Sequence, residues 1–330
     1  MIDMEKQTIA FVVPTGVGAS IGGFAGDASC YARKFAKEFN VIVNPNVVNA
    51  ACFSGITDNM LYTEGWAMSE FFKGKINLKP AKNNKIGIIF DKAIPKDVLN
   101  VHINTVNAVK TVYGVDVSEI EITDESVGVE FFITESGISS GRLNNPETLL
   151  SAGKRLLSKG AEAVAVVALF DNPDEDDGYS KGEAVDVVGG IEAVISHYLS
   201  GELMVPVAHA PAFENNEIST EIVDTRASAE YITPTFLPCI LLGLQNAPKL
   251  ANPDLGGVGV KDLSALVMPY NSLGSSIVFD ALKNNVPVFA VRENKTVLAV
   301  DKFAINYQNR ITEFKDYDEC LSAIKNMQLH

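Results

Sequence analysis

The sequence has few cysteines and no long apolar run, and both shortages narrow the class of protein. Its four cysteines, Cys30, Cys52, Cys239 and Cys320, include no CxxC pair, so a structural zinc site is not expected. It contains no stretch of about 20 apolar residues that would span a bilayer, and the acidic start MIDMEK is unlike a secretory signal. We therefore expect a cytoplasmic protein with reduced thiols and no membrane contact.

Basic residues are also scarce. The 330 residues include 27 Lys and Arg against 41 Asp and Glu, a formal charge of −14. Nucleic-acid grooves and anionic lipid surfaces need dense positive charge, so neither kind of partner is expected. The sequence leaves a homo-oligomer open, and a local pocket can still bind a small anion through backbone N–H groups.

What the sequence does contain is a series of short β-branched runs separated by helix-like segments. This alternation predicts an α/β fold with a mostly parallel sheet and helices on both faces, either as one domain or as two lobes with a ligand cleft between them. The Pro- and Gly-rich stretch 246–262 suggests a main domain 1–245 and a C-terminal strand–helix–strand unit 246–330. The expected strands are Ile9–Val13, Val41–Val43, Ile86–Phe90, Val129–Thr134, Ala163–Phe170, Pro206–Ala210, Ala265–Met268 and Val286–Val291.

Two helices have recognisable ends. Residues 28–39 carry an apolar face, and Asp27 precedes them at a position that favours an N-cap. A second helix is expected to begin with Asn145 as N-cap and Pro146 at the first helical position, and to end at Gly160.

A glycine-rich segment, PTGVGASIGGFAGDA, joins an expected strand to an expected helix near the N-terminus. A strand, a glycine turn and a helix start direct unpaired N–H groups toward one point, and glycine lets a ligand approach the backbone closely. The spacing is neither GxGxxG nor GxxxxGK[ST], which disfavours dinucleotides and NTPs; a tight structural turn is the alternative. The candidate contacts to a phosphate or carboxylate are Gly16, Gly18, Ser20, Gly22 and Gly23.

Two further turns are candidate ligand sites. The turn 271–276, NSLGSS, lies between an expected strand and a helix. By analogy with glycosyltransferases, which often hold a diphosphate at such a place, it is a candidate diphosphate site. A plain turn with Ser275 as N-cap explains the same pattern. The turn 136–142, SGISSGR, offers Arg142 for a bidentate grip on an anion or for a surface ion pair. The candidate binding residues are Asn271, Gly274, Ser275, Ser276, Ser139, Ser140 and Arg142.

The candidate catalytic residues centre on His209. It ends an expected strand between prolines, a place where α/β sheets carry catalytic groups, and we expect it to act as general acid or base with help from Glu64 or Asp27. Cys239 is a candidate nucleophile, although a buried structural thiol is the simpler interpretation. Three amides that follow an expected strand can orient a substrate or cap the next helix; they are Asn44, Asn46 and Asn49.

One more helix-like stretch carries groups that bind metals. Asp186, Glu192 and His197 lie close together in sequence and could ligate a metal, although HExxH is absent; a solvent-facing helix side is the simpler prediction. The acidic stretch 171–177 contains Pro173, which breaks the ligand alternation of an EF-hand loop. The sequence therefore predicts no metal site, and it identifies no cofactor.

Eight segments in one order along nearly the whole chain resemble a known family. They are PTGVGASIGGFAGDA, NPNVVNAA, YTEGWAMSEF, GGIEAVISHYL, PVAHAPA, TFLPCILLGL, PYNSLGSS and VPVFAVREN. Together they resemble domain-of-unknown-function family 3326, a group of α/β proteins. The resemblance implies no particular reaction and assigns no role to a residue. The turn PYNSLGSS departs from the family pattern, because Ser272 and two serines stand where Ala and Gly-Pro are expected.

These observations favour an enzyme, which we expect to be a hydrolase, isomerase or lyase. It would act on a small carboxylate- or phosphate-bearing metabolite by acid–base chemistry, with glycine-rich loops holding the anion. Two alternatives stay open: a transferase that uses a nucleotide-diphosphate donor, and a non-catalytic protein that binds a metabolite.

Overall fold

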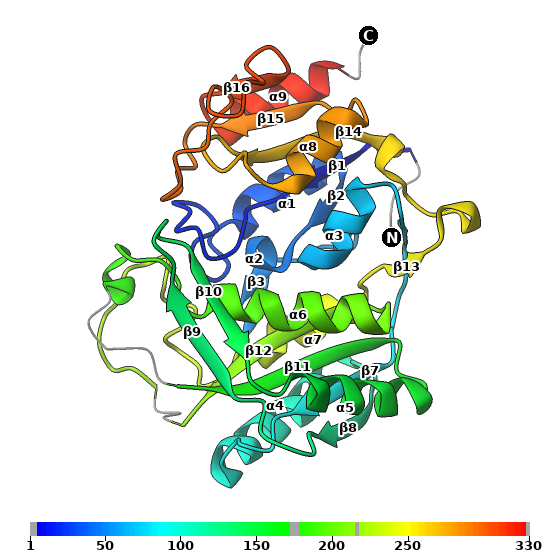
Figure 1. The fold of residues 1–330 in the computed structure, drawn as a ribbon, viewed down its shortest axis with the longest axis vertical. Helices are drawn as coiled ribbons and strands as arrows, with labels where there is room; N and C mark the ends of the chain where they lie inside the picture. The colour runs from blue at the N-terminus through cyan, green and yellow to red at the C-terminus, as the bar shows by residue number, and fades with distance from the viewer. Residues whose placement is uncertain (1–4, 172–177, 215–217, 328–330) are drawn as a thin grey trace.

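The computed structural model describes residues 5–171, 178–214 and 218–327. Its framework consists of two sheets, each built of parallel strands, and one sheet lies above the other in Figure 1. The α/β class with mostly parallel strands is therefore confirmed. Nine helices longer than a 3₁₀ turn are present in the described ranges; the acidic stretch 172–177, discussed above as a calcium loop, lies outside them.

Within the described residues, the first sheet has six strands. They are β1 (Thr8–Phe11), β2 (Asn40–Val43), β5 (Met60–Tyr62), β14 (Leu263–Pro269), β15 (Val288–Val291) and β16 (Ile311–Phe314). Their order is β16-β15-β14-β1-β2-β5, and each neighbouring pair is parallel. Strand β2, which follows β1 in the chain, lies on one side of β1, and β14 lies on the other side. The strand order therefore reverses beside β1, and this position is a topological switch point.

Helices cover both faces of this sheet. Ile9 and Phe11 pack in the same cluster as helices α1 (Ser29–Glu38) and α9 (Tyr317–Met327). Ala10 and Val12 pack in the same cluster as α3 (Gly65–Phe72) and α8 (Ser276–Lys283). Successive side chains of a strand point to opposite faces, so a strand covered on both sides needs the continuous apolar run that the sequence contains.

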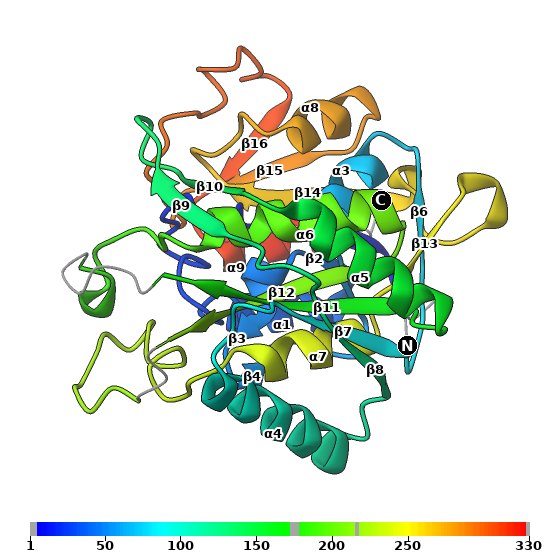
Figure 2. The same cartoon turned by 60° about the horizontal axis from the view of Figure 1, so that its bottom comes forward.

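The second sheet has four parallel strands in the order β12-β11-β7-β8. Helices α4 and α7 cover one face and α5 and α6 the other, as Figure 2 shows. The strands are β7 (Ile86–Phe90), β8 (Val117–Ile122), β11 (Ala163–Phe170) and β12 (Val207–Phe213), and the helices are α4 (Lys96–Tyr113), α5 (Pro146–Ser158), α6 (Gly189–Leu203) and α7 (Leu237–Gln245).

The remaining described elements are short. Helix α2 spans Pro45–Val48, and 3₁₀ turns span Tyr179–Lys181, Pro253–Leu255 and Val260–Asp262. Three antiparallel pairs are β3 (Asn49–Ala50) with β4 (Phe53–Ser54), β6 (Asn77–Lys79) with β13 (Lys249–Ala251), and β9 (Val129–Ile133) with β10 (Ser139–Leu143). The turn predicted at 136–142 is therefore only partly a turn, because its second half pairs with β9.

The eight predicted strands each overlap a strand of the structure. Helix α5 begins at Pro146 after Asn145, as predicted, and ends at Ser158, two residues before Gly160. Asp27 does not cap α1: the N-cap is Ala28, and no side chain caps the helix. The Asp27 carboxylate instead turns back into the preceding loop.

The two sheets share one hydrophobic cluster, which includes Phe11 of the first sheet and Phe90 of the second. The strands after residue 245, β14 to β16, join the sheet that contains β1. The division into domains 1–245 and 246–330, and the description as two lobes with a cleft between them, stay predictions.

Candidate functional site

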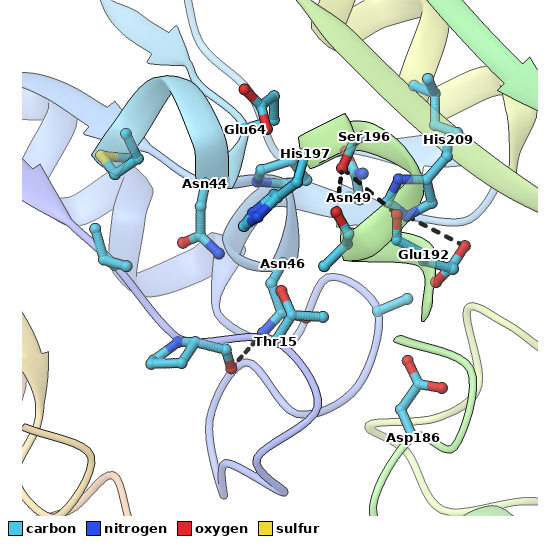
Figure 3. Close-up of a pocket in the computed structure, with 18 of the residues that line it drawn as sticks. Thr15, Asn44, Asn46, Asn49, Glu64, Asp186, Glu192, Ser196, His197 and His209 are labelled. Carbon is cyan, nitrogen blue, oxygen red and sulfur yellow. Dashed lines mark hydrogen bonds and ion pairs between the residues drawn. The ribbon is translucent and has the colours of Figure 1, made fainter. Parts of the chain in front are cut away.

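A cavity of about 320 Å³ lies at the carboxyl ends of the first sheet, where open α/β sheets usually bind ligands. Its walls come from the segments that follow β1, β2 and β5, and from α6 and β12 of the second half. We call it the carboxylate cavity, because four carboxyl groups line it: Glu64, Asp186 and Glu192, which Figure 3 shows, and Glu230.

Two imidazoles share this cavity, and one of them faces a carboxylate. His209 projects from β12 and Glu192 from the first turn of α6, and Nε2 of His209 lies 3.4 Å from Oε1 of Glu192 (Figure 3). That distance exceeds a well-formed hydrogen bond. The other ring nitrogen of His209, Nδ1, is buried without a hydrogen-bond partner among the described residues. The sequence suggested that His209 ends a strand, but it lies inside β12.

The second imidazole, His197, lies further along α6 and against the start of α3. A Cβ atom at Gly65 would stand 1.9 Å from Nε2 of His197, so the ring fills space that only glycine leaves open. Burial, and to a lesser extent the charge of His209, lowers the pKa of His197. His197 is therefore expected to be neutral near pH 7.

Glu64 is first of all a helix cap. Its two carboxylate oxygens accept hydrogen bonds from the backbone N–H groups of Trp66, at 2.8 Å, and Ala67, at 2.7 Å. Burial raises the pKa of Glu64 to about 7, although both N–H groups favour the charged form. The carboxylate thus fixes the start of α3, and with it Gly65 beside His197.

Asp186 and Glu230 tie two irregular segments to the cavity. Oδ1 of Asp186 accepts hydrogen bonds from two backbone N–H groups at the start of α6. Oε1 of Glu230 accepts hydrogen bonds from the N–H of Ala25 and the hydroxyl of Tyr179. Burial, followed by the charge of Glu192, raises the pKa of Asp186, and burial followed by the charge of Asp186 raises the pKa of Glu230. Protons are therefore held in this cavity close to neutral pH.

Ser139 of β10 positions helix α6. Its hydroxyl accepts a hydrogen bond from the N–H of Gly190 at 2.7 Å and donates one to the carbonyl of Val187 at 3.0 Å. A Cβ atom at Gly190 would stand 2.1 Å from the backbone oxygen of Ser139. Ser139, predicted as a ligand contact, therefore binds the helix that carries Glu192 and His197.

The three predicted asparagines all line the cavity, and their side chains form different hydrogen bonds. Asn44 uses both ends of its amide on the backbone of Val13, so it links the ends of β1 and β2. Asn46 donates to backbone carbonyls, including that of Gly22, and Asn49 donates to the hydroxyl of Tyr62 at 3.1 Å. The side-chain oxygens of Asn46 and Asn49 have no hydrogen bond within the described residues and are available to a ligand.

Cys239 also lines the cavity, but its chemistry is that of a buried thiol. The side chain is 2% exposed, and Sγ donates to the carbonyl of Phe236 at 3.0 Å. Burial raises the pKa of Cys239 to about 12. Because the thiolate is the reactive form, this environment counts against the predicted nucleophile.

The glycine-rich segment lines the cavity with Pro14, Thr15, Gly23 and Ala25. Of its predicted contacts only Gly23 lines it among the described residues. Several of the segment's N–H groups are used inside the protein, by acceptors that include Asp27 and Asn294. The donors are Ser20, Ile21, Gly22, Phe24 and Ala25. Of the predicted contacts, Ser20 and Gly22 therefore use their N–H groups internally, whereas the N–H groups of Gly16, Gly18 and Gly23 have no acceptor among the described residues. The anion cradle stays a prediction.

The other predicted site residues are spread over the molecule. Asn271 holds the chain at Thr296 through three hydrogen bonds, and Ser275 lines the cavity whereas Gly274 and Ser276 do not. Arg142 is exposed and pairs with Glu130 at 2.8 Å, on the same strand as Ser140. Asp27 lines a different cavity.

Residues that the sequence analysis did not select complete the site. Asp186, Glu192 and His197, which the sequence offered as metal ligands or as a solvent-facing helix side, all line the cavity. Asp186 precedes α6 and Glu192 is half-buried on it, whereas His197 is exposed, as the solvent-facing interpretation predicted. The i, i+4 spacing of Glu192 and Ser196 was the available signal. Glu230 follows no motif, because an irregular segment carries it to the site. Among the described residues, no group of three or more His, Cys, Asp and Glu side chains is arranged to hold a metal ion.

Two similar proteins were found by comparison with known sequences and structures. The chain is 35% identical over 303 residues to an uncharacterised lipoprotein of Synechococcus sp., covering 89% of this chain and 84% of that protein. An ABC transporter solute-binding protein from Conexibacter woesei is similar with a TM-score of 0.21 and 13% identity, over 61% of this chain and 69% of that one. A TM-score this low carries no argument.

The lipoprotein relative corrects one expectation. A covalently attached lipid holds a protein at a membrane surface. The lipoprotein relative therefore contradicts the expected cytoplasmic location, and that expectation is wrong. Within the described residues, no helix combines the length and apolar character needed to cross a bilayer.

The family suggested by the eight segments is confirmed by a match that covers nearly the whole sequence. Residues 8–329 match the family described as "Protein of unknown function (DUF3326)", and the chain belongs to this family.

Proposed function

We propose that the protein is an enzyme that carries out acid–base chemistry on a small polar metabolite in the carboxylate cavity. The observation that carries the proposal is the pair formed by His209 and Glu192, 3.4 Å apart and each about 15% exposed inside a cavity of about 320 Å³. Catalytic hydrogen bonds are often long before substrate binds and tighten in the complex.

In this proposal His209 exchanges a proton with the substrate. Glu192 then stabilises the imidazolium that forms, because its carboxylate, 3.4 Å away, attracts the positive ring. The side-chain oxygens of Asn46 and Asn49 accept hydrogen bonds from the substrate and fix its orientation. Glu64 acts as a positioning residue through the start of α3, since its oxygens are occupied by backbone N–H groups.

The charge of the cavity bears on the substrate. Four carboxyl groups line it, and none of its described lining residues is Lys or Arg. An anion would meet repulsion from whichever of these groups is ionised, and no lining cation offsets it among the described residues, so the anionic substrate expected from the sequence is not what this cavity favours. Hydrolysis, isomerisation and elimination stay as the reaction classes, because each proceeds by proton transfer at a positioned acid or base.

A metabolite screen followed by a turnover assay tests the proposal. Compounds that raise the melting temperature of the 330-residue chain are taken as ligands, and each is then assayed for conversion. We expect His209→Gln to lower turnover by about 10²–10⁴-fold, the usual contribution of a general acid or base, and Glu192→Gln to lower it as well. Glu202→Gln, which removes an exposed charge from the same helix, is the matched control and should leave turnover unchanged.

Two outcomes would overturn the proposal. Full turnover by His209→Gln would remove the assigned role. Ligands that bind in the cavity without any conversion would instead support a protein that binds a metabolite and does not transform it.

A further inference from the structure

A second cavity, which we call the arginine cavity, shares Ala25 with the carboxylate cavity. Its volume is about 550 Å³, and it lies between the end of the glycine-rich segment, the start of α1, the β3–β4 hairpin and the segment 225–229. Arg33 of α1 and Arg226 of the last segment both line it. The two neighbouring cavities therefore differ in the sign of their strongly charged groups.

Arg226 is held in a fixed orientation. Its Nε donates to Oδ1 of Asp224 at 3.0 Å, and its Nη2 donates to the carbonyl of Gly182 at 2.9 Å. The guanidinium lies over the ring of Phe24, 4.7 Å from the centroid. Within the described residues Nη1 donates no hydrogen bond, so part of an immobilised five-donor group is available to a ligand.

Arg33 is unusual among the arginines of this acidic chain. Its exposed side chain makes no hydrogen bond or ion pair with the described residues. The other five arginines are all engaged: Arg142, Arg155, Arg226 and Arg292 form ion pairs, and Arg310 donates to the carbonyl of Leu282. An open guanidinium at a cavity that also contains a fixed one is a site that favours an anion.

Other lining groups are compatible with an anion. Oγ of Ser54 accepts the N–H of Ile56 at 3.3 Å, which leaves its own hydrogen to donate. Asp27 is the one acid among the described lining residues. Its Oδ1 is turned toward the N–H groups of Gly22 and Phe24, and Asp224, which pairs with Arg226, does not line the cavity.

We propose that the arginine cavity binds an oxyanion group, the phosphate or carboxylate of a small metabolite, through Arg33 and Arg226. The planar guanidinium fork matches both groups, because each presents two oxygens at the spacing of two parallel N–H donors. The volume leaves room for an organic remainder beyond the oxyanion. This site is separate from the proposed chemistry at His209, and it places the anion on two arginines that the sequence analysis did not select.

A thermal-shift titration of the 330-residue chain tests the site with two probes, inorganic phosphate and acetate. Each is compared with sodium chloride at the same ionic strength, so that general screening is subtracted. We expect at least one probe to raise the melting temperature, and the stronger one identifies the oxyanion. Arg33→Met should lose most of that rise, with an apparent dissociation constant at least fivefold weaker, and should keep the melting temperature of the unliganded protein because its side chain is exposed and unpaired.

Lys37→Met is the matched control, because Lys37 is an exposed cation of the same helix outside the cavity. It should respond to the probes as the unmodified protein does. Arg226→Lys keeps the charge but removes the planar fork, and we expect weaker binding of the same probe. The proposal is overturned if neither probe exceeds the chloride control, or if Arg33→Met and Lys37→Met respond alike.

Discussion

The imidazole of His197 lies where a side chain at Gly65 would have to be. An ideal Cβ at Gly65 would stand 1.9 Å from Nε2 of His197, far closer than atoms can approach. Gly65 is the first residue of α3, and His197 belongs to α6 of the other half of the molecule. The absence of one side chain thus sets how closely two helices approach at the carboxylate cavity.

Gly65→Ala should destabilise the protein and displace His197. Forcing a methyl group into a filled space costs about 1–3 kcal/mol, whereas alanine at this helix position is otherwise favourable. The free energy of unfolding, measured by urea denaturation, should fall by that amount. The double variant Gly65→Ala/His197→Ala should be destabilised by less than the sum of the single variants, because the clash is gone. Additive losses would mean that the two residues do not compete for this space.

Ser139→Ala should loosen helix α6. The variant removes the acceptor for the N–H of Gly190 and the donor to the carbonyl of Val187, at a cost of about 1–2 kcal/mol. Ser140→Ala is the control, because Ser140 lies on the same strand and its side chain has no hydrogen bond to the described residues. Hydrogen exchange at the first turn of α6 should accelerate only in Ser139→Ala. Equal exchange rates in both variants would show that Ser139 does not hold the helix.

Stability should fall as the pH rises from about 6.5 to 8. The pKa of Glu64 is raised to about 7, and those of Asp186 and Glu230 are raised as well. In this window the folded protein therefore binds more protons than the unfolded chain, and the free energy of unfolding decreases with pH. His102 and His197, whose pKa values are lowered by burial from 6.5, oppose this trend most at the lower end of the window, where the unfolded imidazoles still take up protons.

Melting temperatures at constant ionic strength across this range measure the effect. Glu230→Gln should flatten the slope, because the amide oxygen still accepts the N–H of Ala25 while the titrating group is removed. Glu202→Gln, at an exposed position, should retain the slope of the unmodified protein. A melting temperature that rises between pH 6.5 and 8 would contradict the raised pKa values.

Much of the fold could be predicted because its signals are local. Strands such as Ile86–Phe90 and Ala163–Phe170 are continuous apolar runs, and their predicted bounds agree with β7 and β11. Strand β10 was missed, because its sequence SSGRL has the small polar residues typical of a turn. It is a strand because the neighbouring β9 pairs with it as a hairpin, and this pairing, not the residue types of β10 itself, holds the segment extended.

The candidate site was predictable where a residue lies on or just after a strand, as His209 does on β12 of the second sheet. Asn44, Asn46 and Glu64 come directly after β2 and β5, and all three line the cavity. Glu230 lies in an irregular segment and reaches the cavity through its hydrogen bonds to Ala25 and Tyr179. Its contribution depends on contacts between residues about 50 to 200 positions apart, which no sequence spacing records.

The sequence by itself determined the α/β class, the main strands and the family, because apolar periodicity and ordered motifs are properties of neighbouring residues. The tertiary structure decided the chemistry of the cavities. The glycine-rich segment was expected to hold an anion, yet some of its N–H groups bind internal acceptors; that of Ile21 binds Asn294, which arrives from the far end of the chain. Whether a backbone N–H is available to a ligand depends on what the folded chain brings beside it.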